Sequence, residues 1–172
     1  MKVLLESPRL IFRELVAVDA PLLFEMDSNQ EVHRYLGNSP LTNPEEAEAV
    51  VLFIQKQYRE NGIGRWALIE KQSGEFMGWA GLKLVKEEIN GHSNFYDLGY
   101  RLMPKYWGRG YATEAAKTLV KYAFETLKLK NLFAFVDPDN KASIRVLEKS
   151  GLQSETRFLY EGQAHLWFHI YL

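Results

Sequence analysis

Two glycines, Gly108 and Gly110, lie in a short turn between a strand pattern and a helix pattern. Across residues 96–102, large apolar or aromatic side chains alternate with Asp, Gly and Arg, which predicts an extended strand. From Ala112 onward, apolar residues recur every three or four positions, so we expect a helix that begins near Tyr111. Glycines at the positive end of a helix leave room for several backbone N–H groups to converge, and such an end binds phosphate oxygens.

Two common phosphate-binding patterns do not match these glycines. The chain has no G-x-x-x-x-G-K-[ST] segment, and the glycine spacing is not G-x-G-x-x-G. A nucleoside triphosphatase and a dinucleotide-dependent dehydrogenase are therefore disfavoured. The structural alternative is an ordinary strand-to-helix turn whose glycines serve only to allow positive φ.

A second polar group follows the continuously apolar residues 132–136, which we expect to form a strand buried on both faces and a candidate for parallel pairing. Asn140 and Ser143 are three residues apart at the start of an expected helix over residues 141–149. If Asn140 caps that helix, both side chains can face one groove. In sheets with parallel strands, ligands bind beyond the carboxyl ends of those strands, which here are Met103 and Asp137.

The segment Y-W-G-R-G-Y-A-T-E-A at Tyr106 to Ala115 resembles the acyl-CoA-binding turn of the GNAT acetyltransferases, especially the Rim-type branch that includes ribosomal-protein N-terminal acetyltransferases. The resemblance covers nearly the whole chain and implies one N-acetyltransferase domain over residues 1–172. It implies the α/β GNAT fold, in which a mixed, mostly antiparallel central sheet has a splayed parallel strand pair and about four flanking helices. Further segments match in the expected order: S-P-R-L-I-F-R-E-L at Ser7 to Leu15, Gly99-Tyr100, D-P-D-N-K-A-S at Asp137 to Ser143, and V-L-E-K-S-G-L at Val146 to Leu152.

The resemblance implies acetyl-CoA as co-substrate and no metal. Its pantetheine arm would lie between the splayed strands, and N–H groups of the glycine turn would hold the pyrophosphate, with Arg109 and Lys105 as sources of positive charge. Trp107 departs from the superfamily's usual Gln or Arg, although Trp is usual in the Rim-type branch, and a packing role is its alternative. The expected cofactor-binding residues are Arg101, Leu102, Met103, Trp107, Gly108, Arg109, Gly110, Tyr111, Ala112, Asn140 and Ser143.

Asp97 is the candidate general base. An amine attacks a thioester only when neutral, and a lysine amine has a pKa of about 10.4 whereas an α-amine lies near 8, so a base must remove a proton. Several relatives carry a glutamate at this strand position, and the shorter aspartate would act through a bridging water. A structural salt bridge is the competing role for Asp97, with Glu161 and Tyr160 as reserve candidates.

Ser143 is the candidate acid for the departing CoA thiolate. Many GNAT enzymes place a tyrosine four residues beyond this serine, where the present chain has Leu147. Helix capping or simple solvation is the alternative role for Ser143. His165 and His169 suggest a metal site only on a helix, because four residues of a strand span roughly 13 Å.

Composition narrows the class of protein. The 172 residues are 47% hydrophobic and 25% charged, as in one ordinary globular domain. With 21 basic and 22 acidic residues, the net charge of −1 argues against sequence-independent nucleic-acid binding. The absence of cysteine excludes disulfides, thiolate metal sites and a cysteine nucleophile. No signal peptide or membrane span is expected, which predicts a cytoplasmic enzyme.

The rest of the chain supplies further expected elements. Turn and capping residues divide it into helices, strands and one polar loop, which we expect to be mobile. The expected helices are one capped by Asp19 with Leu22, Leu23 and Met26 on its buried side, one spanning 31–36 and one from Asn43 to Asn61. The other expected elements are strands at 9–15, 65–70 and 75–85, the loop at 86–93, and a hairpin of 152–159 with 164–172 around Glu161-Gly162.

These observations predict an N-acetyltransferase that moves acetyl from acetyl-CoA to a primary amine by direct attack in a ternary complex. A protein N terminus and a small-molecule amine both remain open as the acceptor, as does the oligomeric state. Neither membrane nor direct nucleic-acid binding is expected. The alternative is a non-catalytic acyl-CoA-binding or regulatory module of the same fold.

Overall fold

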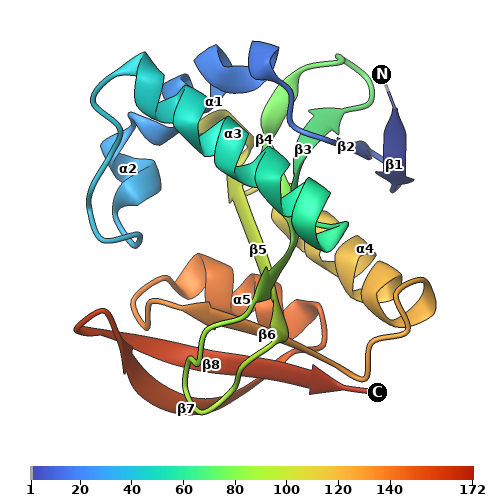
Figure 1. The fold of residues 1–172 in the computed structure, drawn as a ribbon, viewed down its shortest axis with the longest axis vertical. Coiled ribbons are helices and arrows are strands. Elements are labelled where there is room, and N and C mark those ends of the chain that lie inside the picture. The colour runs from blue at the N-terminus through green and yellow to red at the C-terminus, as the bar shows by residue number, and fades with distance from the viewer. Residues whose placement is uncertain (1) are drawn as a thin grey trace.

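An eight-stranded sheet forms the centre of the computed structural model, which describes residues 2–172 (Figure 1). The strand order is β1-β2-β3-β4-β5-β6-β8-β7, and every neighbouring pair is antiparallel except β5 and β6. The strands are β1 Val3–Glu6, β2 Leu10–Arg13, β3 Arg65–Glu70, β4 Phe76–Val85, β5 Phe95–Leu102, β6 Asn131–Val136, β7 Gln153–Tyr160 and β8 Gln163–Tyr171.

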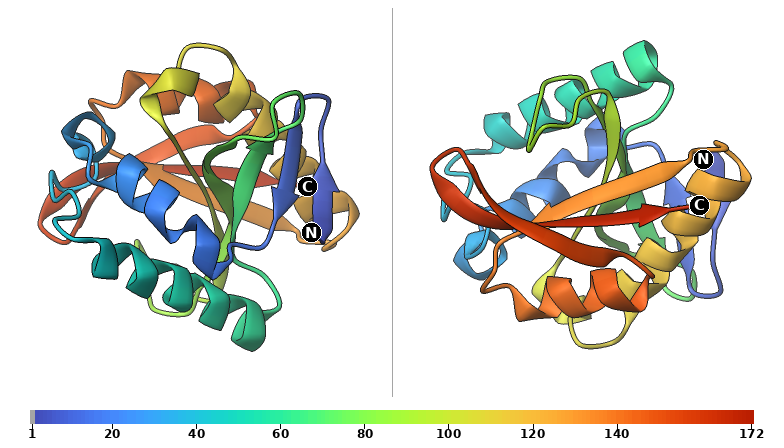
Figure 2. Two further views of the ribbon diagram at one scale, coloured as in Figure 1. Left: turned by 90° about the horizontal axis from the view of Figure 1, so that it is seen from above. Right: turned by 90° about the horizontal axis from the view of Figure 1, so that it is seen from below.

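Helices cover both faces of the sheet, with α1 and α3 on one face and α4 and α5 on the other (Figure 2). The α-helices are α1 Ala20–Asp27, α2 Gln30–His33, α3 Pro44–Asn61, α4 Tyr111–Glu125 and α5 Lys141–Lys149, and the short 3-10 helices are η1 Ala17–Asp19 and η2 Pro104–Tyr106. The predicted GNAT-like architecture is confirmed. The described residues contain five α-helices, one more than the family resemblance implied, and α2 is a single turn.

The seam between β5 and β6 is the one parallel pairing in the described sheet. β4 and β5 stay in register from Gly78 opposite Leu102 to Val85 opposite Phe95. In contrast, β5 and β6 share one registered pair, Asp97 with Phe133. The two strands therefore part toward their carboxyl ends, as predicted for a splayed pair.

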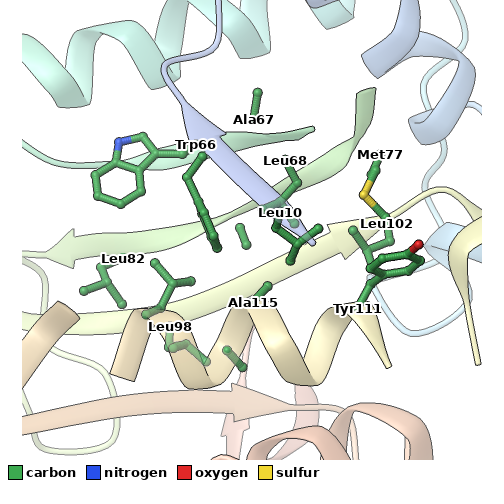
Figure 3. Close-up of a cluster of buried hydrophobic side chains, with 14 of the residues drawn as sticks. Leu10, Trp66, Ala67, Leu68, Met77, Leu82, Leu98, Leu102, Tyr111 and Ala115 are labelled. Carbon is green, nitrogen blue, oxygen red and sulfur yellow. The ribbon is translucent and has the colours of Figure 1, made fainter. Parts of the chain in front are cut away.

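Helix α4 packs closely on β4 and β5 because its inner face carries small side chains (Figure 3). Ala115 and Ala116 are fully buried, and Leu82, Leu98 and Leu102 of the sheet lie in the same core. Burial of this face at about 25 cal/mol per Å² of apolar surface stabilises the helix and fixes where its first turn lies. The start of α4 at Tyr111 agrees with the sequence prediction.

Local sequence signals correctly predicted where several helices and one hairpin turn begin or end. Asn43 accepts the N–H of Glu46, while the Glu46 side chain returns to the Asn43 backbone, which is the capping box that starts α3. Gly62 ends this helix in the left-handed conformation at φ 69°. In the β7–β8 hairpin, Glu161 and Gly162 both have positive φ, of 49° and 77°, as a two-residue type I′ turn requires.

The start of the chain differs from the prediction in four ways. Strand β1 had no sequence prediction. Asp19 does not cap α1: its carboxylate accepts two hydrogen bonds from Arg13, at 2.6 and 2.7 Å, and one from the Val16 N–H. Leu22 was expected on the buried side of α1 but is 38% exposed. The helix expected over residues 31–36 is shorter, since α2 ends at His33.

Two residues of the polar loop at residues 86–93, which was predicted to be mobile, pack against the rest of the protein. Ile89 within it is 6% exposed and belongs to a small core that includes Trp167. The His92 ring stacks on Trp167 with a centroid distance of 5.2 Å and an interplanar angle of 12°. An apolar residue among charged neighbours thus ties the loop to β8.

Within residues 2–172, none of the helices combines the length and the apolar character needed to cross a bilayer.

Candidate active site

A cavity of about 1010 Å³ runs along the seam between β5 and β6. Its walls come from the turn before α4, from α5, from α2 and the residues after it, and from the tip of the β7–β8 hairpin. The cavity brings together most of the site residues predicted from sequence, although Met103, Lys105 and Arg109 do not line it. The predicted residues that line it are Asp97, Arg101, Leu102, Trp107, Gly108, Gly110, Tyr111, Ala112, Asn140, Ser143, Tyr160 and Glu161.

The turn before α4 presents unpaired backbone donors to this cavity. Gly108 and Gly110 have φ of 70° and 79°, the left-handed region that glycine adopts most easily. Within residues 2–172, the N–H groups of Gly108, Arg109 and Gly110 have no protein acceptor. The first N–H groups of α4 also lack partners inside the helix, and they lie at its positive end. This arrangement fits a diphosphate.

Only alternate residues at the end of β5 present their backbone to the seam. Met103 donates its N–H to the carbonyl of Met77 in β4 at 2.9 Å. Because backbone direction alternates along a strand, Arg101 also points its N–H and C=O toward β4, whereas Leu102 points them toward β6. Of the three residues predicted to pair with pantetheine, Leu102 is therefore the one with an N–H directed into the seam.

Trp107 connects this strand end to the turn. Its indole N–H donates to the carbonyl oxygen of Leu102 at 2.8 Å, and its side chain remains 45% exposed while lining the cavity. The indole therefore supports the turn and also forms part of its accessible surface.

Asp97 is buried in an ion pair with Arg65. Arg65 Nη2 lies 2.5 Å from Asp97 Oδ2, while Nη1 donates to the main-chain carbonyls of Asp97 and Gly81. The guanidinium fits over the sheet because Gly99 has no side chain: a Cβ there would lie 2.7 Å from Arg65 Nη2. Burial raises the pKa of Asp97, and Arg65 partly offsets that effect. The carboxylate lines the cavity at 8% residue exposure.

Asn140 and Ser143 adopt the arrangement expected for the start of α5. Asn140 Oδ1 accepts the Ser143 N–H at 3.1 Å, so Asn140 caps the helix and both residues line the cavity. Leu147 is 2% exposed and packs in the core. Tyr100, which had no predicted role, reaches across from β5 and donates its hydroxyl to the Ser143 carbonyl at 3.2 Å. Burial raises the pKa of Tyr100 to about 12.

On the other side of the seam, Trp79 lies between two arginines. The guanidinium carbons of Arg65 and Arg101 are 5.2 and 5.1 Å from its ring. Arg101 Nη1 also donates to Asp27 Oδ1 at 2.9 Å, and His33 Nε2 lies 3.7 Å from the same oxygen. Burial lowers the pKa of His33, as does Arg101. Arg101 thus contributes its side chain to this wall, whereas the prediction concerned its backbone.

The hairpin tip closes another part of the cavity. Tyr160 and Glu161 both line it, and Glu161 is exposed. Burial raises the pKa of Tyr160, and the neighbouring charges of Glu161, Glu87 and Asp97 raise it further. The principal candidate base and the two reserve candidates therefore share one cavity.

A model of the acetyltransferase (GNAT) domain family matches residues 9–153. The uncharacterized N-acetyltransferase p20 of Bacillus licheniformis is 32% identical over 151 residues, covering 88% of this chain and 83% of p20. The uncharacterized N-acetyltransferase YoaA of Bacillus subtilis is 33% identical over 152 residues, covering 88% of this chain and 84% of YoaA. Among solved structures, RimL, a ribosomal L7/L12 alpha-N-protein acetyltransferase in complex with coenzyme A, matches with a TM-score of 0.83 over 99% of this chain and 98% of its own, at 17% identity.

Proposed function

Because this chain belongs to the acetyltransferase (GNAT) family, and is an acetyl-CoA-dependent N-acetyltransferase, we propose that it transfers acetyl to a primary amine by direct attack in a ternary complex. The observation that supports this proposal best is the turn with unpaired N–H groups from Gly108 to Gly110, whose two glycines line the same cavity as Asp97. One end of the cavity suits a diphosphate and the other holds a buried carboxylate. A thioester placed between them would meet an amine on the Asp97 side.

Holding the two reactants in place is the main service of this site, because the thioester is already activated. The turn would bind the diphosphate, and Asn140 and Leu102 would orient the pantetheine arm along the seam. The Leu102 N–H would polarise the thioester carbonyl as negative charge develops on its oxygen. Two of the predicted cofactor residues, Tyr111 and Ala112, would contribute N–H groups from the first turn of α4.

Asp97 would accept the proton that the amine loses, through a bridging water. Burial brings the pKa of Asp97 above its usual range, which improves the carboxylate as a base, and Arg65 holds it in one orientation. The amine nitrogen forms the new C–N bond, the C–S bond breaks, and the sulfur keeps the electron pair. Ser143 would donate a hydroxyl hydrogen bond to that thiolate, and Tyr100, whose own hydroxyl donates to the Ser143 carbonyl, would support Ser143.

The acceptor that we favour is the N terminus of a protein or peptide, with a small-molecule amine as the second candidate. The sequence of the turn resembles the Rim-type branch, and RimL, named as an alpha-N-protein acetyltransferase, shares the fold. An α-amine has a pKa near 8, against about 10.4 for lysine, so a carboxylate base already engaged by Arg65 suits the α-amine better.

An assay of CoA thiol release tests both the transferase activity and the proposed acceptor class. Purified protein and acetyl-CoA are mixed with a peptide with a free N terminus, the same peptide blocked there but carrying lysine, or a polyamine. We expect release of CoA thiol with the free N terminus. Release only with lysine or the polyamine would overturn the acceptor class. Acetyl-CoA binding without thiol release for any amine would instead support the non-catalytic module.

A further inference from the structure

Arg9 contacts the diphosphate-binding turn from outside the cavity. Its Nη1 donates to the carbonyl oxygen of Arg109 at 3.0 Å, and its guanidinium carbon lies 4.2 Å from the centroid of the Tyr111 ring. Its Nη2 is 3.5 Å from the position that a Cβ on Gly110 would take. One side chain from the loop before β2 therefore contacts Arg109 and Tyr111, the residues on either side of Gly110.

Glu114, in the first turn of α4, holds Arg9 in that position. Its Oε2 accepts from Arg9 Nε at 2.6 Å, and its Oε1 accepts from the Arg9 N–H at 2.8 Å and from Ser7 Oγ at 2.6 Å. Burial raises the pKa of Glu114, but the hydrogen bonds from Ser7 and Arg9 outweigh burial and leave the pKa below its usual range. The carboxylate is therefore ionised at neutral pH and binds both the side chain and the main chain of Arg9.

These contacts determine which way the peptide between Arg109 and Gly110 faces. A trans peptide is planar, so its carbonyl oxygen and its N–H point in opposite directions. Arg9 binds the oxygen on the outer side, where Arg9 does not line the cavity. The N–H of Gly110 consequently points the other way, toward the cavity that Gly110 does line.

We propose that Arg9 and Glu114 are positioning residues for coenzyme binding, acting through the Arg109–Gly110 peptide. The inference rests on the proposed binding of the acetyl-CoA diphosphate at this turn. A peptide next to a glycine rotates at low cost, since glycine accepts both signs of φ. Rotation of this peptide would replace a donor with a carbonyl oxygen that repels the diphosphate. The Arg9–Glu114 pair prevents that rotation.

The test compares two acetyl donors. Acetyl-CoA carries the diphosphate, whereas S-acetylpantetheine lacks it. For Arg9→Gln we expect kcat/KM with acetyl-CoA to fall about tenfold, the equivalent of one charge-assisted hydrogen bond, and kcat/KM with S-acetylpantetheine to stay unchanged. Lys71→Gln is the matched control, because Lys71 pairs with Glu6 at 2.6 Å near the same edge but does not touch the turn. It should leave both donors unaffected.

A second variant covers the case in which Arg9→Gln does not fold. Arg9→Lys keeps the charge beside Glu114, but one ammonium cannot follow the fork geometry that serves both Glu114 and the Arg109 carbonyl. We expect a folded protein with a several-fold loss for acetyl-CoA alone. Equal losses for both donors, or no loss with acetyl-CoA, would overturn the positioning role. Failure of the wild-type protein to bind CoA would instead count against the proposed function.

Discussion

The indole nitrogen of Trp107 lies 2.8 Å from the carbonyl oxygen of Leu102, so a single side chain links the end of β5 to the turn before α4. The N–H of Leu102 faces the seam, and Trp107 directly precedes the three residues of the turn whose N–H groups are unpaired. The hydrogen bond therefore sets the distance between the strand end, which would bind the pantetheine arm, and the turn, which would bind the diphosphate. A substitution that removes the indole N–H should therefore weaken coenzyme binding.

We expect Trp107→Phe to raise the KM for acetyl-CoA several-fold, since one neutral hydrogen bond contributes about 0.5–1.5 kcal/mol. The KM for the acceptor should change little. Steady-state kinetics with each substrate varied in turn checks this expectation. Trp79→Phe is the comparison, because Trp79 lies on the other wall and should affect the acceptor instead. The reverse pattern would contradict the assigned walls.

Gly110 and Gly74 provide a matched pair for testing the turn. Both have positive φ, 79° and 74°, and no backbone atom lies near the position of an added Cβ in either. Gly110→Val and Gly74→Val should each lower the free energy of unfolding by about 1–2 kcal/mol, the cost of a left-handed side chain. Calorimetry with CoA should show lost binding only for Gly110→Val. Retained affinity there would show that the turn does not hold the coenzyme.

Asp97→Asn tests the general base. In the wild type, kcat/KM should rise with pH as Asp97 loses its proton, and burial places that rise above the usual aspartate range. The Asn variant should lose this rise and about 10²–10⁴ in kcat. A raised folded-state pKa also means that the stability contributed by Asp97 falls as pH rises. If a folded Asn variant kept the wild-type kcat, Asp97 would be a structural partner of Arg65 and not the general base.

Ser143→Ala tests the hydroxyl proposed to meet the thiolate. We expect kcat to fall about tenfold with little change in the KM for acetyl-CoA, because the hydrogen bond strengthens as charge develops on sulfur. Tyr100→Phe removes the hydroxyl that donates to the Ser143 carbonyl while keeping the ring. Measuring kcat for both single variants and for the double variant shows how much each hydroxyl contributes. An unchanged kcat in the double variant would contradict both.

Stability at acid pH offers an independent check on Glu114. Its pKa is lower in the folded protein than in the unfolded chain, so its stabilising effect is complete above the unfolded value and is lost as pH falls through the folded value. The difference in melting temperature between the wild type and Glu114→Gln should therefore shrink on acidification. A difference that stays constant with pH would show that ionisation of Glu114 is not responsible.

Local patterns in the sequence were sufficient for much of the fold. The glycine turn, the capping box of α3 and the β7–β8 turn are each specified by residues a few positions apart, and the structure confirms them. The Asn140 cap was also predictable from adjacent residues. Such features depend on backbone propensity, which nearby side chains determine.

Contacts between distant segments were not predictable in the same way. Arg65 with Asp97 and Arg9 with Glu114 join residues far apart in the chain, and nothing in one sequence states which charges will meet. Competition within one segment also misleads: the carboxylate of Asp19 binds Arg13, six residues earlier, and does not cap α1.

Because β5 and β6 share only one registered pair, a coenzyme bound between them would stabilise the fold in addition to taking part in the reaction. Strands β6, β8 and β7 meet the other five with little main-chain bonding across the junction, so an occupant of the gap would bridge two otherwise weakly joined pieces. Ligand that binds only the native state raises its stability in proportion to the logarithm of concentration. Cellular acetyl-CoA levels would then govern how firmly the carboxyl-terminal quarter of the chain, residues 131–172, stays packed against the rest.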